Sequence, residues 1–179
     1  MTTSKQEAQW VLRAQCEDRE ALELVLRSVQ APLRRYLVRL VGEASADDVL
    51  QETLILISRK IGWLDVPEAF HAWAYRVASR AAFRYLKREK RWSEQVRDEA
   101  VLGEIPAVEC AAPQEILPEL LNSGALSAAS RAVLVLHFEE ELPLPEVAAV
   151  LEIPLGTVKS RLAYGLAALR RKLDSIRSV

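Results

Sequence analysis

One acidic, proline-containing stretch, residues 93–123, interrupts a sequence that otherwise keeps its apolar residues at helical spacing. On both sides, apolar residues recur every three or four positions, and no segment shows the strict alternation of a half-buried strand. The stretch itself carries seven carboxylates and three prolines against one base, Arg97: Glu94, Asp98, Glu99, Glu104, Glu109, Glu115, Glu119, Pro106, Pro113 and Pro118. We therefore predict an all-α protein in which an acidic linker joins two small helical domains.

The predicted domains cover residues 1–92 and 124–179, and the linker covers 93–123. In the first domain we expect a short helix, a longer one that Pro32 kinks or interrupts, and a third helix capped by Ser45. A fourth helix, from about residue 68 to about residue 91, should follow a cap at Asp65 and Pro67 in its first turn. In the second domain we expect a helix capped by Ser127 and then two helices joined by a tight turn.

Composition limits the classes of function. Half of the 179 residues are apolar, 27% are charged and the net charge is −1, which is a globular composition. The two cysteines, Cys16 and Cys110, lie far apart, so we expect neither a disulfide framework nor a zinc site. We also expect no other metal, no cofactor and no catalytic residue, because no motif for them is present. The polar N-terminal residues and the lack of an apolar run of roughly 18 residues predict a cytoplasmic protein without membrane insertion.

The stretch "GTVKSRLAYG", residues 156–165, is a candidate DNA-binding helix. Val158 and Leu162 begin an apolar stripe that should pack inward. The outer face and its flanks then carry hydroxyls and bases: Thr157, Lys159, Ser160, Arg161 and Tyr164. On the second helix of a helix-turn-helix, such side chains suit phosphate and major-groove contacts. A plain helical hairpin with a solvated face would give the same pattern, so both interpretations stay open here.

A second candidate is the long basic helix "EAFHAWAYRVASRAAFRYLKREKRW". Its bases include Arg76, Arg80, Arg84, Lys87 and Arg88, and aromatic residues lie between them. Basic side chains can follow a phosphate backbone, and aromatic rings can stack on unpaired nucleobases. The alternative is that the aromatic residues belong to the core and the bases form a solvated face.

A third candidate is "DDVLQET", in which Asp48, Gln51 and Glu52 share one helical face. Paired carboxylates can act in catalysis or bind a metal. No histidine or cysteine lies near them in the sequence, so we expect a solvated face or one that meets a basic partner.

Taken together, these stretches resemble a sigma factor of the extracytoplasmic-function group (group 4) of the sigma-70 family, which has only regions 2 and 4. "DREALELVLRSV" looks like the start of region 2, and "DDVLQETLILI" looks like its polymerase-docking segment. "FHAWAYRVASRAAFRYLKREKR" is similar to the helix that handles the −10 element, and "GTVKSRL" to the helix that reads the −35 element. The motifs occur in the family's order and cover most of the chain.

The resemblance implies an RNA polymerase sigma factor that directs core polymerase to specific promoters and has no catalysis of its own. The implied partners are the β′ clamp and β flap of the polymerase core, promoter DNA and an anti-sigma factor. Asp48, Gln51 and Glu52 would meet the core. Trp63 and Leu64 would line a pocket for a flipped −10 base, with the basic helix along the strand. The −35 element would be read by the candidate DNA-binding helix, through Thr157, Lys159, Ser160, Arg161 and Tyr164.

Two other functions remain open from the residues alone. One is a stand-alone helix-turn-helix regulator, and the other is a helical interaction protein that has lost DNA binding. The chain also departs from the family pattern: Arg80 stands where many members have Asn, and Arg84 where many have an acidic residue. Glu152 replaces a common glycine at the turn, and Gly165 in mid-helix is expected to cost up to about 1 kcal/mol relative to alanine.

Overall fold

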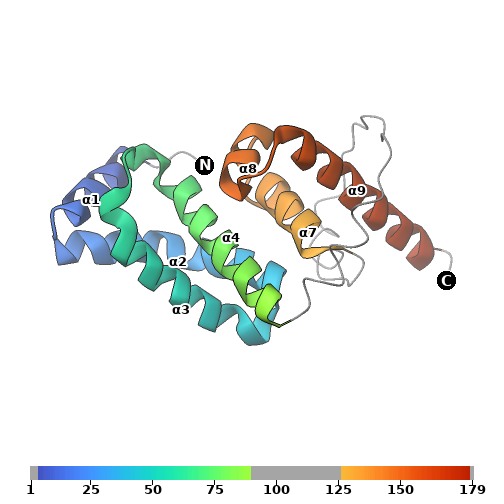
Figure 1. Cartoon of the computed structure of the whole chain (residues 1–179), viewed down its shortest axis with the longest axis horizontal. Coiled ribbons are helices and arrows are strands. Elements are labelled where there is room, and N and C mark those ends of the chain that lie inside the picture. The colour runs from blue at the N-terminus through green and yellow to red at the C-terminus, as the bar shows by residue number, and fades with distance from the viewer. Residues whose placement is uncertain (1–3, 90–125, 178–179) are drawn as a thin grey trace. The chain divides into compact units, whose positions relative to one another are not determined.

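The computed structural model describes residues 4–89 and 126–177. All regular structure in these residues is helical and none of it is strand, which confirms the predicted all-α class (Figure 1). The chain divides into two compact units, the first formed mainly by residues 1–85. The predicted linker lies outside the described residues, as do Lys90, Arg91 and Trp92, so the predicted domain boundaries stay predictions. None of the described helices is long and apolar enough to cross a membrane.

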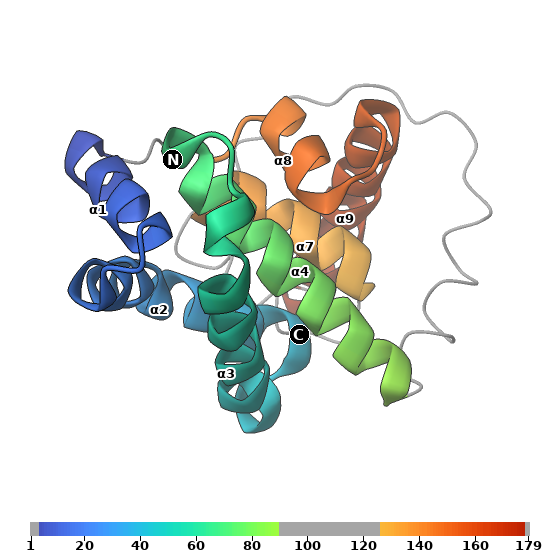
Figure 2. The same ribbon diagram turned by 60° about the vertical axis from the view of Figure 1, so that its left-hand side comes forward.

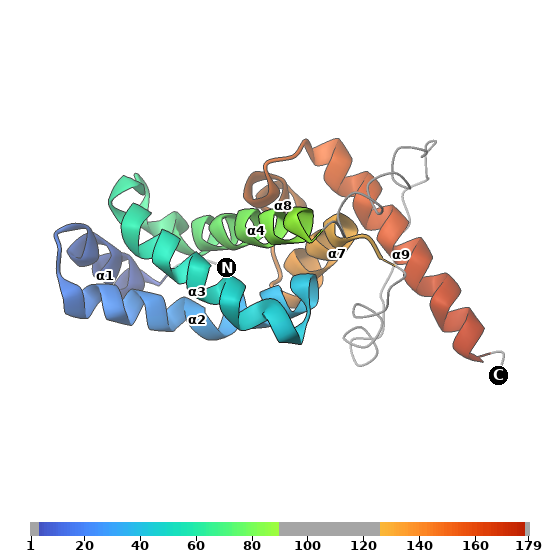
Figure 3. The same cartoon turned by 60° about the horizontal axis from the view of Figure 1, so that its bottom comes forward.

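The first unit is built from consecutive helices. They are α1 (Lys5–Gln15), α2 (Arg19–Val41), α3 (Glu43–Lys60), the short 3-10 turns η1 (Ile61–Trp63) and η2 (Pro67–Ala69), and α4 (Phe70–Arg88). α1 packs against α2 (Figure 2). α3 runs back along α2, and the two lie side by side (Figures 1 and 3). This arrangement leaves one face of α3 open to solvent.

Two sequence predictions about helix starts in this unit are wrong, and a third is narrowed. α2 runs through Pro32 without interruption, so of the two predicted effects of Pro32 only a kink stays a prediction. α3 starts at Glu43 rather than after Ser45, because Gly42 adopts a φ of +86° and turns the chain directly from α2 into α3. The Ser45 hydroxyl instead pairs with the Tyr85 hydroxyl at 2.7 Å. Asp65 does not cap a helix, since Val66 is the N-cap residue of η2.

A buried polar contact lies at the centre of the first unit. Tyr36 of α2 is fully buried, and its ring meets that of Tyr75 edge-on at 5.4 Å between centroids. The Ser79 hydroxyl donates to the Tyr75 carbonyl, so it accepts from the Tyr36 hydroxyl, 2.7 Å away. These contacts hold α4 against α2.

The second unit contains the predicted helical hairpin. Its elements are α7 (Ala128–Leu134), a π-helical turn η4 (Val135–Glu139), α8 (Leu144–Leu151) and α9 (Leu155–Arg177). The Ser127 side chain accepts from the Ser130 backbone, which confirms the predicted cap. Between α8 and α9, Glu152 adopts a φ of +56°, and the next amide, of Ile153, donates to the Ala148 carbonyl. This left-handed conformation favours glycine, which explains why glycine suits this position.

Gly165 allows α9 to approach α7 closely. A Cβ at this position would lie 2.8 Å from Leu134 Cδ1 and 3.3 Å from its Cγ, and Leu134 is fully buried. The glycine is therefore a packing requirement, although the sequence alone indicated only a helix-propensity cost.

We expect Gly165→Ala to destabilise the chain by about 1–2 kcal/mol, because overpacking against Leu134 outweighs the gain in helix propensity. Gly156 is the matched control, since it lies on the same helix and a Cβ there would meet nothing within 4 Å. Gly156→Ala should leave stability unchanged or raise it. Urea unfolding followed by circular dichroism measures both variants, and a more stable Gly165→Ala protein would contradict the packing argument.

Candidate functional site

The exposed face of α3 carries the three residues predicted to meet a partner. Asp48 and Gln51 are exposed, and the Glu52 side chain is 34% exposed. Ile55, one turn further on, is 44% exposed, so an apolar side chain lies beside these polar ones. The opposite face is buried through Val49, Leu50, Thr53 and Ile57. α3 therefore presents an acidic surface with an apolar residue at its end, which suits a basic partner.

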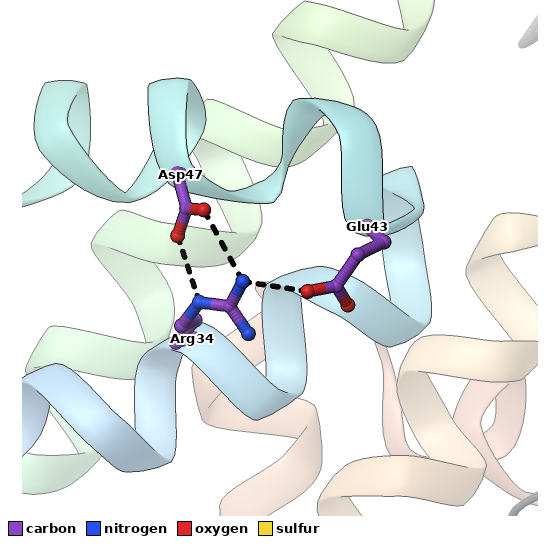
Figure 4. A network of polar contacts seen from close by, with 3 residues as sticks. All are labelled: Arg34, Glu43 and Asp47. Carbon is purple, nitrogen blue, oxygen red and sulfur yellow. Dashed lines mark hydrogen bonds and ion pairs between the residues drawn. The ribbon is translucent and has the colours of Figure 1, made fainter.

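A network of ion pairs fixes the start of α3 to α2 (Figure 4). Arg34 Nε and Nη2 donate to both carboxylate oxygens of Asp47, at 2.7 and 3.2 Å, and Nη2 also reaches Glu43 at 2.6 Å. The hydrogen bonds from Arg34 lower the pKa of Asp47 below its ordinary value, so the carboxylate stays ionised. Asp47 is thus engaged within the fold, whereas its neighbour Asp48 faces solvent.

The structure brings together two residues that the sequence analysis assigned to different partners. Glu52 Oε1 lies 3.5 Å from Arg84 Nη1 on α4. Glu52 was predicted to meet polymerase, and Arg84 was predicted to follow the −10 strand. The surfaces predicted to face polymerase and DNA are therefore joined by an ion pair between α3 and α4, which sequence spacing alone did not indicate.

The loop after α3 separates the two residues predicted to hold a flipped base. The Trp63 side chain is 77% exposed, and the Lys60 ammonium lies 5.9 Å from its ring centroid. Leu64 is only 9% exposed, so it supports the loop from beneath. The open ring face of Trp63 is available for stacking. The role of Leu64 at a base pocket stays a prediction.

The bases of α4 form one stripe at helical spacing. Arg80, Arg84, Lys87 and Arg88 are exposed, and Arg76 is half-buried. Trp73 is also only partly exposed, and Phe70 is fully buried, so the first aromatic residues of the helix belong largely to the core. The stripe can follow a phosphate backbone, as its charge predicts.

The start of α9 presents the residues predicted to contact duplex DNA. Val158 is fully buried and Lys159 and Ser160 are exposed, which agrees with the predicted orientation of the helix. Thr157, Arg161 and Tyr164 are half-buried. The Ser160 hydroxyl donates to the Thr157 carbonyl at 3.0 Å, and its oxygen remains free to accept.

No group of three metal-binding side chains occurs in residues 4–89 or 126–177. His71 is buried and its Nε2 lies 3.2 Å from Glu7 of α1. Although burial raises it, the pKa of Glu7 is lowered by hydrogen bonds from Ser4 and His71, so α1 and α4 are joined by an ionised carboxylate. These contacts give the histidine and the carboxylate a structural role.

Family comparisons decide between the functions left open by the residues. The model described as "Sigma-70 region 2" matches residues 25–92, and "Sigma-70, region 4" matches residues 124–171. The chain belongs to the sigma-70 family. It carries both conserved regions in the family's order, with the acidic α3 face in region 2 and the α8–α9 hairpin in region 4. It is thus an RNA polymerase sigma factor, a subunit that directs core polymerase to promoters.

The relatives of this sigma factor match it over almost their whole length. It is 28% identical to the RNA polymerase sigma-H factor of Pseudomonas aeruginosa, over 98% of each chain. It is 27% identical to the ECF RNA polymerase sigma factor SigW of Bacillus subtilis, over 89% of this chain and 92% of SigW. A third relative, the ECF RNA polymerase sigma-E factor of Escherichia coli K12, is 26% identical over 93% of both chains. The similarity to extracytoplasmic-function members therefore extends across both regions.

Solved structures show the same fold. The sigma factor RpoE of Bartonella quintana, crystallised with the anti-sigma factor NepR, matches with a TM-score of 0.62 and 25% identity. The match covers 85% of this chain and 96% of that one. CnrH, in complex with the cytosolic domain of CnrY, matches with a TM-score of 0.68 and 22% identity, over 94% of this chain and 97% of that one.

Proposed function

We propose that this sigma factor is a group 4, extracytoplasmic-function member that acts in the cytoplasm and has no catalysis of its own. It binds core polymerase through the exposed α3 face, −10 DNA through the Trp63 loop and α4, and −35 DNA through α9. The observation that supports the proposal most is the exposure of the α3 face. Asp48, Gln51 and Ile55 are exposed on a helix whose opposite face is buried in the core. The full-length similarity to extracytoplasmic-function relatives supports the subgroup.

On this proposal the α3 face meets a basic and partly apolar surface of the β′ clamp. Asp48 and Glu52 supply charge, Gln51 supplies a hydrogen-bonding amide, and Ile55 supplies apolar contact. Charge complementarity of this kind speeds association and selects the partner. Region 4 contacts the β flap, so the two regions hold the polymerase at both promoter elements.

The −10 site combines the indole ring of Trp63 with the stripe from Arg76 to Arg88. The −10 strand must be unpaired to be read. An extruded nucleobase can then stack on the exposed indole ring, while the arginine and lysine side chains of α4 follow the phosphates of the strand. Arg80 and Arg84 add positive charge to this stripe, which attracts the phosphates of the strand. Leu64 forms the floor beneath the stacked base.

The −35 site uses the first turns of α9. Lys159 and Ser160 lie on the exposed face, and Thr157, Arg161 and Tyr164 lie at its margins. An anti-sigma factor is a further proposed partner, supported by the similar sigma factor RpoE, whose solved structure is a complex with the anti-sigma factor NepR.

Lys159→Ala is expected to lower affinity for a −35 duplex about fivefold and to reduce the salt dependence by about one phosphate contact. Affinity for core polymerase should stay unchanged. The matched control is Arg170→Ala, which removes an exposed, positively charged side chain about three turns further along the same helix. Fluorescence anisotropy at several salt concentrations measures both. Equal loss in the two variants would remove Lys159 from the interface.

Complex formation tests the proposal as a whole. We expect the chain to co-elute with core polymerase in gel filtration and to bind promoter fragments tightly only in that complex. Tight duplex binding without polymerase, together with no co-elution, would overturn the proposal in favour of a stand-alone helix-turn-helix regulator.

A further inference from the structure

Gln15, the last residue of α1, makes two hydrogen bonds to the loop that carries Trp63. Its amide nitrogen Nε2 donates to the Ile61 carbonyl at 3.0 Å and to the Leu64 carbonyl at 2.7 Å. A side-chain amide nitrogen has two N–H donors, so each carbonyl receives one. The two acceptors lie on either side of Trp63 in the sequence, and 46 to 49 residues separate them from Gln15.

Trp63 is exposed between two buried side chains of this loop. Ile61 is 4% exposed and Leu64 is 9% exposed, whereas Trp63 between them is 77% exposed. The Leu64 amide also bonds to the Ile61 carbonyl at 3.1 Å, which closes the turn. Two buried side chains and one bridging amide therefore fix the backbone on both sides of the exposed indole.

A tryptophan exposed to this degree offers a large aromatic surface on which a nucleobase can stack. Fixing its backbone in advance lowers the entropy cost of capturing a ligand. We propose that Gln15 is a positioning residue for promoter recognition, which holds Trp63 ready to stack on an extruded base of the −10 strand. This inference rests on the proposed function of the Trp63 loop, and it assigns a part in that function to α1.

Gln15→Glu is the sharpest test, because it keeps the side chain's shape, removes both donors and places a carboxylate against two carbonyl oxygens. Gln9→Glu is the matched control: Gln9 is exposed on the same helix and the change in charge is identical. Gln15→Ala is a second variant that removes the bridge without adding charge. Circular dichroism melts first establish that each variant is folded.

The readout uses holoenzyme assembled from core polymerase and each variant, with a forked promoter fragment selected by the wild-type holoenzyme from a random library. A single abasic site is moved along the unpaired −10 strand. In the wild type, the abasic site should weaken binding most at the position that stacks on Trp63, and in Trp63→Ala this penalty should disappear. Gln15→Glu and Gln15→Ala should each reduce the penalty about fivefold, because the ring is no longer held in place. Gln9→Glu should retain the full penalty.

The outcomes separate this inference from the proposal on which it depends. If Trp63→Ala keeps the wild-type abasic penalty, the Trp63 loop is not the base site and both fail. If Trp63→Ala loses it but folded Gln15→Glu and Gln15→Ala keep it, the base site stands and Gln15 has only a structural role. A lowered melting temperature with an unchanged abasic penalty would likewise overturn the inference.

Discussion

Asp48→Lys should lower affinity for core RNA polymerase about tenfold or more, because it reverses charge at the centre of the exposed α3 face. Asp48 is exposed, so the replacement has room and the fold should be unaffected. Glu52→Lys should have at least as large an effect, since it also places a second positive charge beside Arg84, 3.5 Å from the present carboxylate. Both losses should shrink as salt concentration rises.

Glu20→Lys is the matched control. Glu20 is also exposed and lies on α2 of the first unit, and the substitution changes the net charge by the same amount. It should bind core polymerase like the wild type. Titration of labelled protein with core polymerase at two salt concentrations gives the three affinities. If Asp48→Lys and Glu20→Lys bind equally well, the α3 face does not dock on polymerase.

Tyr36→Ala should destabilise the chain by about 3–5 kcal/mol, the usual cost of truncating a buried aromatic residue. Tyr36 is fully buried, it meets the Tyr75 ring at 5.4 Å, and its hydroxyl bonds to Ser79. Its loss leaves a cavity between α2 and α4 and removes the donor to the Ser79 oxygen. A loss of this size is a large share of the roughly 5–15 kcal/mol that stabilises a typical domain.

Tyr36→Phe separates the two contributions, because it keeps the ring and removes only the hydroxyl. It should cost about 1 kcal/mol, the net contribution of one hydrogen bond. Tyr164→Ala, which truncates a half-exposed tyrosine on α9, should cost less than Tyr36→Ala. Urea unfolding gives the three values. A Tyr36→Ala protein as stable as Tyr36→Phe would show that the ring contributes nothing to the packing of α2 on α4.

Much of the fold was predictable because helix formation leaves local signals. The break before α2, the cap at Ser127 and the tight turn between α8 and α9 all follow from residues within one or two helical turns. The error at Ser45 has a local origin too. Ser45 has typical capping chemistry, but Gly42 ends α2 and turns the chain directly into α3.

For the candidate site, the sequence predicted only which residues share one face of a single helix. Helical spacing placed Asp48, Gln51 and Glu52 together and turned Lys159 and Ser160 outward. It could not show contacts between side chains of different helices, such as Arg34 of α2 with Glu43 and Asp47 of α3. The contact between Gln15 and the Trp63 loop was likewise invisible, because a polar residue at a helix end carries no signal of its partner. From the sequence, Gly165 predicts only a cost in helix propensity. Its packing role depends on Leu134, which lies 31 positions away in the sequence.

Run-off transcription with purified core polymerase and a library of promoter fragments tests whether this chain directs polymerase to promoters. We expect core polymerase alone to start at none of the selected promoters, and adding this chain to give defined start sites, each preceded by shared −10 and −35 sequences. Adding the Asp48→Lys variant should give markedly less transcript from the same sites. Transcripts that are identical with and without the chain would contradict its role as a sigma factor.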